Sequence, residues 1–251
     1  MTLDLQHAAQ RRMRRAVLVL VAVVLLLVAA LVVIATRDGG SDNGKGSPTQ
    51  SSPTPKAMPT LPEDDGGYVA PTQYVKLPDG AEKAGDLPTK FPRTPEGATA
   101  MLVASARNAW SFDAATVKAG ILAYASADYR DSMAASAEDG AVGNREFAGV
   151  PATGDLPAGA TLNAWPIGVQ WSETDASTVN ALILLRVTHA AKEGAEPTTT
   201  IVVSPAQAVW EEGDWKVMPT DPAENLPDPV DVGTAKFNED GWKAIQEGDR
   251  L

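Results

Sequence analysis

A continuous apolar run at Ala16–Ala35 constrains this chain more than any other feature. It reads AVLVLVAVVLLLVAALVVIA and contains no charged or polar residue, no Gly and no Pro. A helix of this length is about 30 Å long, which matches the hydrocarbon core of a bilayer. A buried core helix normally keeps a polar stripe, and a signal peptide has a shorter apolar stretch of about 7–15 residues. The run therefore predicts a transmembrane helix over residues 16–36.

The charges beside this run predict its orientation. Four arginines precede it within residues 11–15, whereas one Arg and one Lys follow it before residue 46, together with two Asp. Positive charge is retained on the cytoplasmic side. We therefore expect a single-pass protein of the cell membrane, with a basic cytoplasmic tail at residues 1–15 and an extracytoplasmic C-terminal domain.

Residues 37–92 are rich in Gly, Ser, Thr and Pro and have few apolar side chains. Such a segment buries too little surface to offset the entropy of ordering it. We interpret it as a linker that carries the domain away from the membrane. Within it, Tyr68–Leu87 contains several apolar residues and could instead pack on the domain as an extended arm.

Composition excludes several kinds of chemistry. The formal net charge is −11, which disfavours binding to nucleic acid because both molecules are negative. The chain has no Cys, so it has no thiol nucleophile, iron–sulfur cluster or Cys-based zinc site. The acidic residues at positions 221–231 lack the spacing of an EF-hand loop. We expect no cofactor and no metal.

The first half of the predicted domain, residues 93–251, has helical periodicity. Thr94 is a suitable N-cap, Pro95 suits the first helical position and Glu96 the first turn. A helix is predicted from there to Asn108 or Trp110. Asp113 is expected to cap a second helix, and a third should run from Ser126 or Ala127 to about residue 137, followed by a loop over residues 140–160.

The second half changes to a period of two, which is typical of strands. Strands are expected over residues 161–171, where Trp165, Ile167, Val169 and Trp171 alternate with small or polar residues, and over 178–189, 198–210 and 215–218. Glu212-Gly213 predicts a hairpin in which Trp210 faces Trp215. A last short helix, capped by Asn238 or Glu239, is expected to run through Glu247. The expected fold class is α+β, with about three helices packed on a curved four-stranded antiparallel sheet.

This order of elements resembles the NTF2-like fold. The helix start TPEGA at residues 94–98 and the hairpin WEEGDW at residues 210–215 resemble that group. With the anchor and linker, the layout is similar to that of the VirB8 and TcpC-like conjugation proteins. The resemblance implies a membrane-anchored extracytoplasmic scaffold or assembly subunit of a conjugative-transfer or type IV secretion-like envelope complex. Its partners would be other envelope proteins and further copies of itself.

No catalytic motif is present: the sequence has no G-x-S-x-G, H-E-x-x-H or Walker loop. We therefore expect no enzymatic activity, although two alternatives stay open. One is a small-ligand-binding module at the cell surface, and the less favoured one is an enzyme of the same fold. Trp171 and Trp210, near strand ends, are the candidates for a pocket or interface. The titratable candidates for an enzyme are Asp113, Asp128, Tyr124, Tyr129 and His189.

Overall fold

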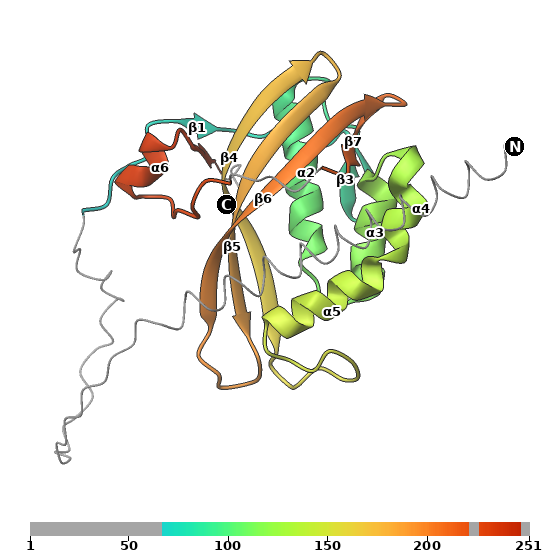
Figure 1. Cartoon of the computed structure of the whole chain (residues 1–251), viewed down its shortest axis with the longest axis vertical. Helices are drawn as coiled ribbons and strands as arrows, with labels where there is room; N and C mark the ends of the chain where they lie inside the picture. Colours follow the sequence, from blue (N-terminus) through green and yellow to red (C-terminus); the bar gives the residue numbers. More distant parts are fainter. Residues whose placement is uncertain (1–66, 221–225, 247–251) are drawn as a thin grey trace, which may run out of the picture. The chain divides into compact units, whose positions relative to one another are not determined.

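Three long strands form the framework of the domain. In the computed structural model, which describes residues 67–220 and 226–246, they are the central members of a mixed sheet with the order β1-β8-β4-β5-β6-β7 (Figure 1). From Tyr68 onward, the described residues belong to one compact unit. The strands of this sheet are β1 (Tyr74–Val75), β4 (Thr161–Asp175), β5 (Thr178–Ala190), β6 (Thr198–Glu211), β7 (Asp214–Met218) and β8 (Lys243–Ile245).

The expected four-stranded antiparallel sheet is wrong, because the sheet has six strands and includes a parallel pair. β4, β5, β6 and β7 pair in sequence order with antiparallel registers. β8 is added antiparallel to β4, and β1 is added parallel to β8. These added strands are two and three residues long, so they show no recognisable period in the sequence.

One face of the sheet is covered by helices, and α2 lies across it (Figure 1). The side chain of Thr94 caps α2 by accepting a hydrogen bond from the backbone N–H of Gly97 at 3.1 Å, as predicted. Ala98, Met101 and Leu102 then pack against the sheet and are buried. The helices are α2 (Pro95–Ala109), α3 (Ala114–Tyr124), α4 (Ala127–Ala135), α5 (Ala137–Phe147) and α6 (Ala235–Glu239).

The opposite face of the sheet carries a second, smaller core. Leu184 of β5 packs there with Phe237 of α6 and with Trp242, and all three are buried. Gly168 of β4 makes this packing possible, since a Cβ atom at that position would lie 2.8 Å from the ring of Phe237. Both faces of β5 are therefore covered in its middle, as its sequence predicted.

Two predicted segments differ from the structure. The loop expected over residues 140–160 is wrong in its first part, because α5 extends to Phe147. Ala137 and Ala141 of this helix are buried against Val117 of α3. The expected helix over residues 239–247 is also wrong. α6 ends at Glu239, Gly241 adopts a positive φ of 77°, and β8 follows.

Residues 68–92, which composition assigned to the linker, contain β1 and a small antiparallel pair, β2 (Glu82–Ala84) and β3 (Leu87–Thr89). Val75 and Phe91 are buried in the main core. The predicted cytoplasmic tail and transmembrane helix, and the linker up to residue 66, lie outside the described residues. Among the helices that are described, none is both long and apolar enough to cross a membrane.

Candidate interaction surfaces

Trp171 and Trp210 lie on the helix-covered side of the sheet and are half-buried. The structure does not bring them together. Trp171 of β4 pairs with Ala181 of β5, which in turn pairs with Ala206 of β6. Trp210 lies further along β6, where it pairs with Trp215. The two candidates therefore do not form one aromatic patch.

Each of the two tryptophans is occupied by internal contacts. The Nζ atom of Lys243 lies 3.4 Å from the ring centroid of Trp171, which ties β8 to β4 through a cation–π contact. Trp210 packs edge-on against Trp215, with ring centroids 5.3 Å apart, and the guanidinium of Arg93 lies 5.2 Å from its ring. These contacts identify structural roles for both side chains.

A buried polar cluster lies beside the β6–β7 hairpin. The carboxylate of Asp214 accepts hydrogen bonds from the backbone N–H groups of Phe91 and Trp215, and pairs with Lys216 at 3.3 Å. Lys216 also donates to the carbonyl of Ala123. Burial, and then the charge of Asp214, raise the pKa of Tyr124 to about 12, so this hydroxyl stays protonated at neutral pH.

His189 lies at the end of β5, against the edge of the Phe147 ring at a centroid distance of 5.1 Å. Burial lowers its pKa, although a hydrogen bond with the backbone of Ala148 acts in the opposite direction. The buried carboxylate of Asp214 is at the other end of the sheet. Since Thr198 pairs with His189 and Glu211 pairs with Asp214, nearly the whole of β6 separates the two groups, a path on the order of 40 Å. They cannot act together on one substrate.

The remaining titratable candidates have structural roles or are exposed. Asp113 caps α3 by accepting bonds from the backbone N–H groups of Ala115 and Thr116. The Thr116 hydroxyl, together with these backbone N–H groups, lowers the pKa of Asp113. Asp128 is exposed in the first turn of α4, and Tyr129 follows it on the same helix. No group of acidic, His or Cys side chains within the described ranges could hold a metal ion.

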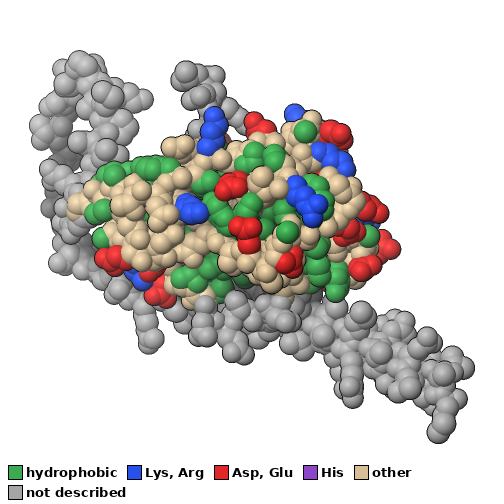
Figure 2. Space-filling view, turned by 90° about the horizontal axis from the view of Figure 1, so that it is seen from above, with side chains coloured by type: hydrophobic (Ala, Val, Ile, Leu, Met, Phe, Trp, Pro, Cys, Tyr) green, Lys and Arg blue, Asp and Glu red, His purple; other side chains and the backbone are tan. Residues whose placement is uncertain are grey.

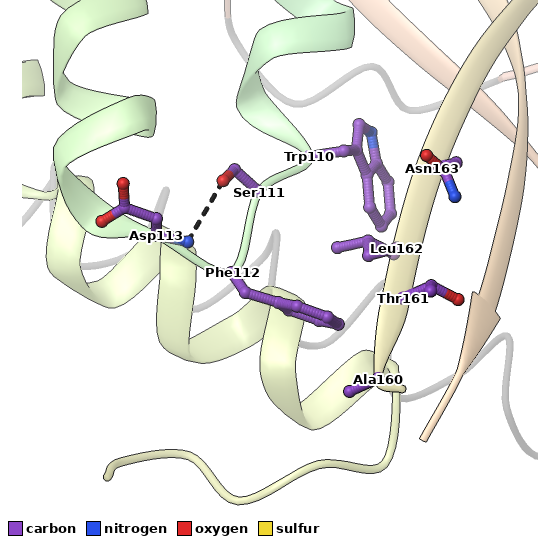
Figure 3. A pocket seen from close by; sticks show the side chains of 8 residues that line it. All are labelled: Trp110, Ser111, Phe112, Asp113, Ala160, Thr161, Leu162 and Asn163. Atoms are coloured by element: carbon purple, nitrogen blue, oxygen red, sulfur yellow. Dashed lines mark hydrogen bonds between the residues drawn. The ribbon is translucent and has the colours of Figure 1, made fainter. Parts of the chain in front are cut away.

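An open pocket of about 350 Å³ lies between the loop that joins α2 to α3 and the start of β4 (Figure 3). Trp110 and Phe112 form its aromatic walls, and Leu162 lines it from the strand. Its polar groups are partly committed, because Ser111 Oγ accepts a bond from the Asp113 N–H at 3.1 Å. Sequence reasoning missed this pocket, although two aromatic residues in one short interhelical loop are a signal that could have indicated it.

The surface seen from above carries acidic and basic side chains in a mixed arrangement, with apolar side chains between them (Figure 2). It shows no continuous basic stripe of the kind that binds a nucleic-acid backbone. Tyr74 of β1, Leu122 of α3 and Trp165 of β4 are exposed large apolar side chains. They come from different elements and supply scattered contact points.

Among the described strands, the outer edge of β6 is open over much of its length. β7 pairs only with Gln207–Glu211, so it leaves the preceding part of β6, from Thr198 to Ala206, without a neighbouring strand among the described residues. This stretch contains no charged side chain, and six of its residues are Thr, Ile or Val. Unprotected strand edges of this composition are sites of pairing with another chain.

No family model, curated protein or solved structure matches the chain.

Proposed function

We propose that this protein is a membrane-anchored extracytoplasmic scaffold, and that it serves as an assembly subunit of a conjugative-transfer or type IV secretion-like envelope complex. The apolar run at Ala16–Ala35 would fix the chain in the membrane, and the Gly-, Ser- and Pro-rich segment would set its reach. The domain would then bind other envelope proteins.

One observation on the described domain carries the proposal: its buried charged groups have internal partners, whereas a strand edge and several apolar side chains are exposed. The buried Asp214 and the half-buried Lys216 bond to each other and to the backbone, the buried Tyr124 hydroxyl is uncharged at neutral pH, and His189 is remote from the Asp214 carboxylate. The edge of β6 and the exposed apolar side chains are, by contrast, available for contacts. This combination suits a binding protein better than an enzyme.

The proposal is tested in the full-length chain by changing the length of the linker and, separately, the side chain of His189. Deleting residues 39–62 should abolish crosslinking to envelope partners and lower transfer or secretion efficiency, because flexible chain of this length spans roughly 25–30 Å. Replacing the same residues with a Gly/Ser segment of equal length is the matched control and should preserve both. His189→Ala should also preserve both. The opposite result would favour an enzyme: a folded His189→Ala protein loses all transfer or secretion activity, while the protein with residues 39–62 deleted keeps it.

The pocket at Trp110 supports a second candidate, a small-ligand-binding module. An aromatic-walled hollow of about 350 Å³ has room for a small organic molecule. Trp110→Ala would then remove binding of that molecule, whereas Tyr74→Ala, which truncates an exposed aromatic ring on β1, would not. Screening metabolites by the change in thermal unfolding temperature tests this candidate, and a binding protein should show a shift that Trp110→Ala abolishes.

A further inference from the structure

We propose that the open edge of β6 pairs with the same edge of a second copy of this chain, in antiparallel register with Ile201 opposite its counterpart. The two sheets would then join into one, about a two-fold axis through Ile201. This inference rests on the proposed scaffold function and names one of the scaffold's partners.

The direction of the backbone groups of β6 supports this pairing. The N–H of Trp210 donates to the carbonyl of Ser177 on the β5 side, so even-numbered residues of β6 face β5. The register with β5 is continuous from Thr178 to His189, so the alternation holds along the strand. Odd-numbered residues therefore direct their N–H and C=O groups outward, and these include Thr199, Ile201 and Val203. Among the described residues, no backbone hydrogen bond is found for these outward groups.

Two prolines limit the edge symmetrically. Pro205 is four residues after Ile201, and Pro197 is four residues before it. Pro205 occupies an odd, outward-facing position of β6, where the missing N–H would be a donor to a neighbouring strand, and Pro197 directly precedes the first residue of β6. In the register centred on Ile201, Pro205 of one copy lies opposite Pro197 of the other, at the two ends of the ladder. Between them, Thr199, Ile201 and Val203 would form three pairs with about six backbone hydrogen bonds.

The side chains of the edge also complement themselves. In this register Thr198 lies opposite Ser204, Thr200 opposite Val202, and Ile201 opposite itself. A hydroxyl pair and β-branched pairs of this kind stabilise antiparallel strands. A two-fold axis places like charges near one another, so a charged edge would repel its copy. This edge carries no charge although the chain has a formal net charge of −11.

The edge also has room for a second strand. β7 begins to cover β6 at Gln207, beyond the segment Thr198–Ser204 that would pair. The β5–β6 hairpin projects at the lower end of the sheet, away from β7 (Figure 1). An antiparallel strand could therefore lie along this part of β6 without displacing β7.

Disulfide formation tests the register directly, because the chain has no Cys of its own. Two differently tagged full-length chains, Thr198→Cys and Ser204→Cys, are produced together in membranes and treated with a mild oxidant. Thr198 and Ser204 form a non-hydrogen-bonded pair, with an expected Cα separation of about 4.5 Å, which a disulfide can span. We expect most of the linked product to contain both tags.

Thr198→Cys chains alone are the matched control. Their two Cys would lie six positions apart along the paired strands, or about 20 Å, which no disulfide spans. Equal linking in the control and in the mixed sample would overturn the register. Absence of linking in both samples would overturn the pairing. This is the result expected if a strand from another protein, or from residues outside the described ranges, covers this edge instead.

A second pair of variants tests the outward N–H groups. Thr199→Pro removes one of them, whereas Thr199→Ala keeps it, and both remove the side-chain contact with the Thr188 hydroxyl. The full-length protein in detergent should therefore be dimeric with Ala and monomeric with Pro, as measured by sedimentation. Far-ultraviolet circular dichroism checks that both variants fold. Equal dimerisation of the two folded variants would contradict the inference.

These outcomes are separable from those of the proposed function. If Thr199→Pro is monomeric but still crosslinks to envelope proteins, the scaffold proposal is supported and the edge supplies only self-association. If the Thr198→Cys and Ser204→Cys chains do not link while the linker deletion still abolishes partner crosslinking, only the self-pairing is wrong.

Discussion

At the scale of single residues, the Tyr124 hydroxyl is the most unusual group in the domain. It is buried and has no hydrogen-bond partner among the residues that the structure describes, although the charge of Asp214 is near enough to raise its pKa. An unsatisfied buried polar group destabilises a fold by roughly 1–3 kcal/mol. We therefore expect Tyr124→Phe, which keeps the ring, to leave the free energy of unfolding unchanged or to raise it by about 1 kcal/mol. Urea unfolding of residues 68–251 measures this.

The same residue predicts a pH dependence. The pKa of Tyr124 is raised from 10.0 to about 12, so between these values the unfolded chain loses a proton that the folded protein keeps. The stability contribution is present below pH 10 and is lost as the pH rises toward 12. Unfolding at pH 9, 10 and 11 should show a steeper decline for the natural protein than for Tyr124→Phe. Identical slopes would show that another group governs the alkaline range.

Trp215 is a residue whose role was predicted from the sequence and is confirmed. It faces Trp210 across the hairpin, is 2% exposed, and donates from its indole N–H to the carbonyl of Pro92 at 2.8 Å. Truncating a buried aromatic side chain costs about 3–5 kcal/mol. We expect Trp215→Ala to lower the free energy of unfolding by this amount, and Trp165→Ala, which removes a 44% exposed ring, to lower it far less. A loss below about 1 kcal/mol for Trp215→Ala would contradict this.

At the scale of elements, the hairpin turn is the place where one substitution should strengthen the fold. Glu212 and Gly213 both have positive φ, 52° and 78°, which favours Asn-Gly over Glu-Gly. Glu212→Asn should therefore raise the free energy of unfolding by a few tenths to about 1 kcal/mol. Gly213→Ala should lower it, because Ala is strained at that φ. Thermal unfolding of both variants tests the turn, and a destabilised Glu212→Asn would show that the Glu side chain matters more than its backbone.

The elements that were predicted correctly have long periodic patterns or a strong local signal. β5 alternates over many residues, β6 is rich in β-branched residues, and Thr94-Pro95 and Asp113 start helices through local hydrogen bonds. α5 was missed because its glycines indicate a loop, and only packing against α3 makes the helix stable.

β4 shows a different limit of sequence reasoning. The register with β5 shifts between Pro166 and Gly168, so Ile167 packs in the smaller core while Val169 packs in the main one. The alternation expected from Trp165 to Trp171 therefore does not lie on one face. A bulge depends on the partner strand, which the sequence of β4 alone does not specify.

The candidate surfaces show the same division between local and long-range information. Trp171 and Trp210 were singled out by residue type, and the structure gives them cation and ring partners from β8, from β7 and from the segment before α2. The pocket at Trp110 and the open edge of β6 depend on where each strand begins and ends relative to its neighbours. These limits are set by the pairing of the strands in the sheet, which local sequence does not specify.

At the scale of the whole molecule, the proposed membrane topology predicts which end of the chain an external protease can reach. Four arginines before Ala16, against a mixed-charge segment after residue 36, predict that the domain lies outside the cytoplasmic membrane. A chain with an N-terminal and a C-terminal tag should therefore lose only its C-terminal tag when protease is added to intact protoplasts, as measured by immunoblotting. Replacing the four arginines with Glu should weaken this asymmetry, and lysed protoplasts should lose both tags. Protection of the C-terminal tag until lysis would reverse the orientation, and the proposal of an extracytoplasmic scaffold would then be wrong.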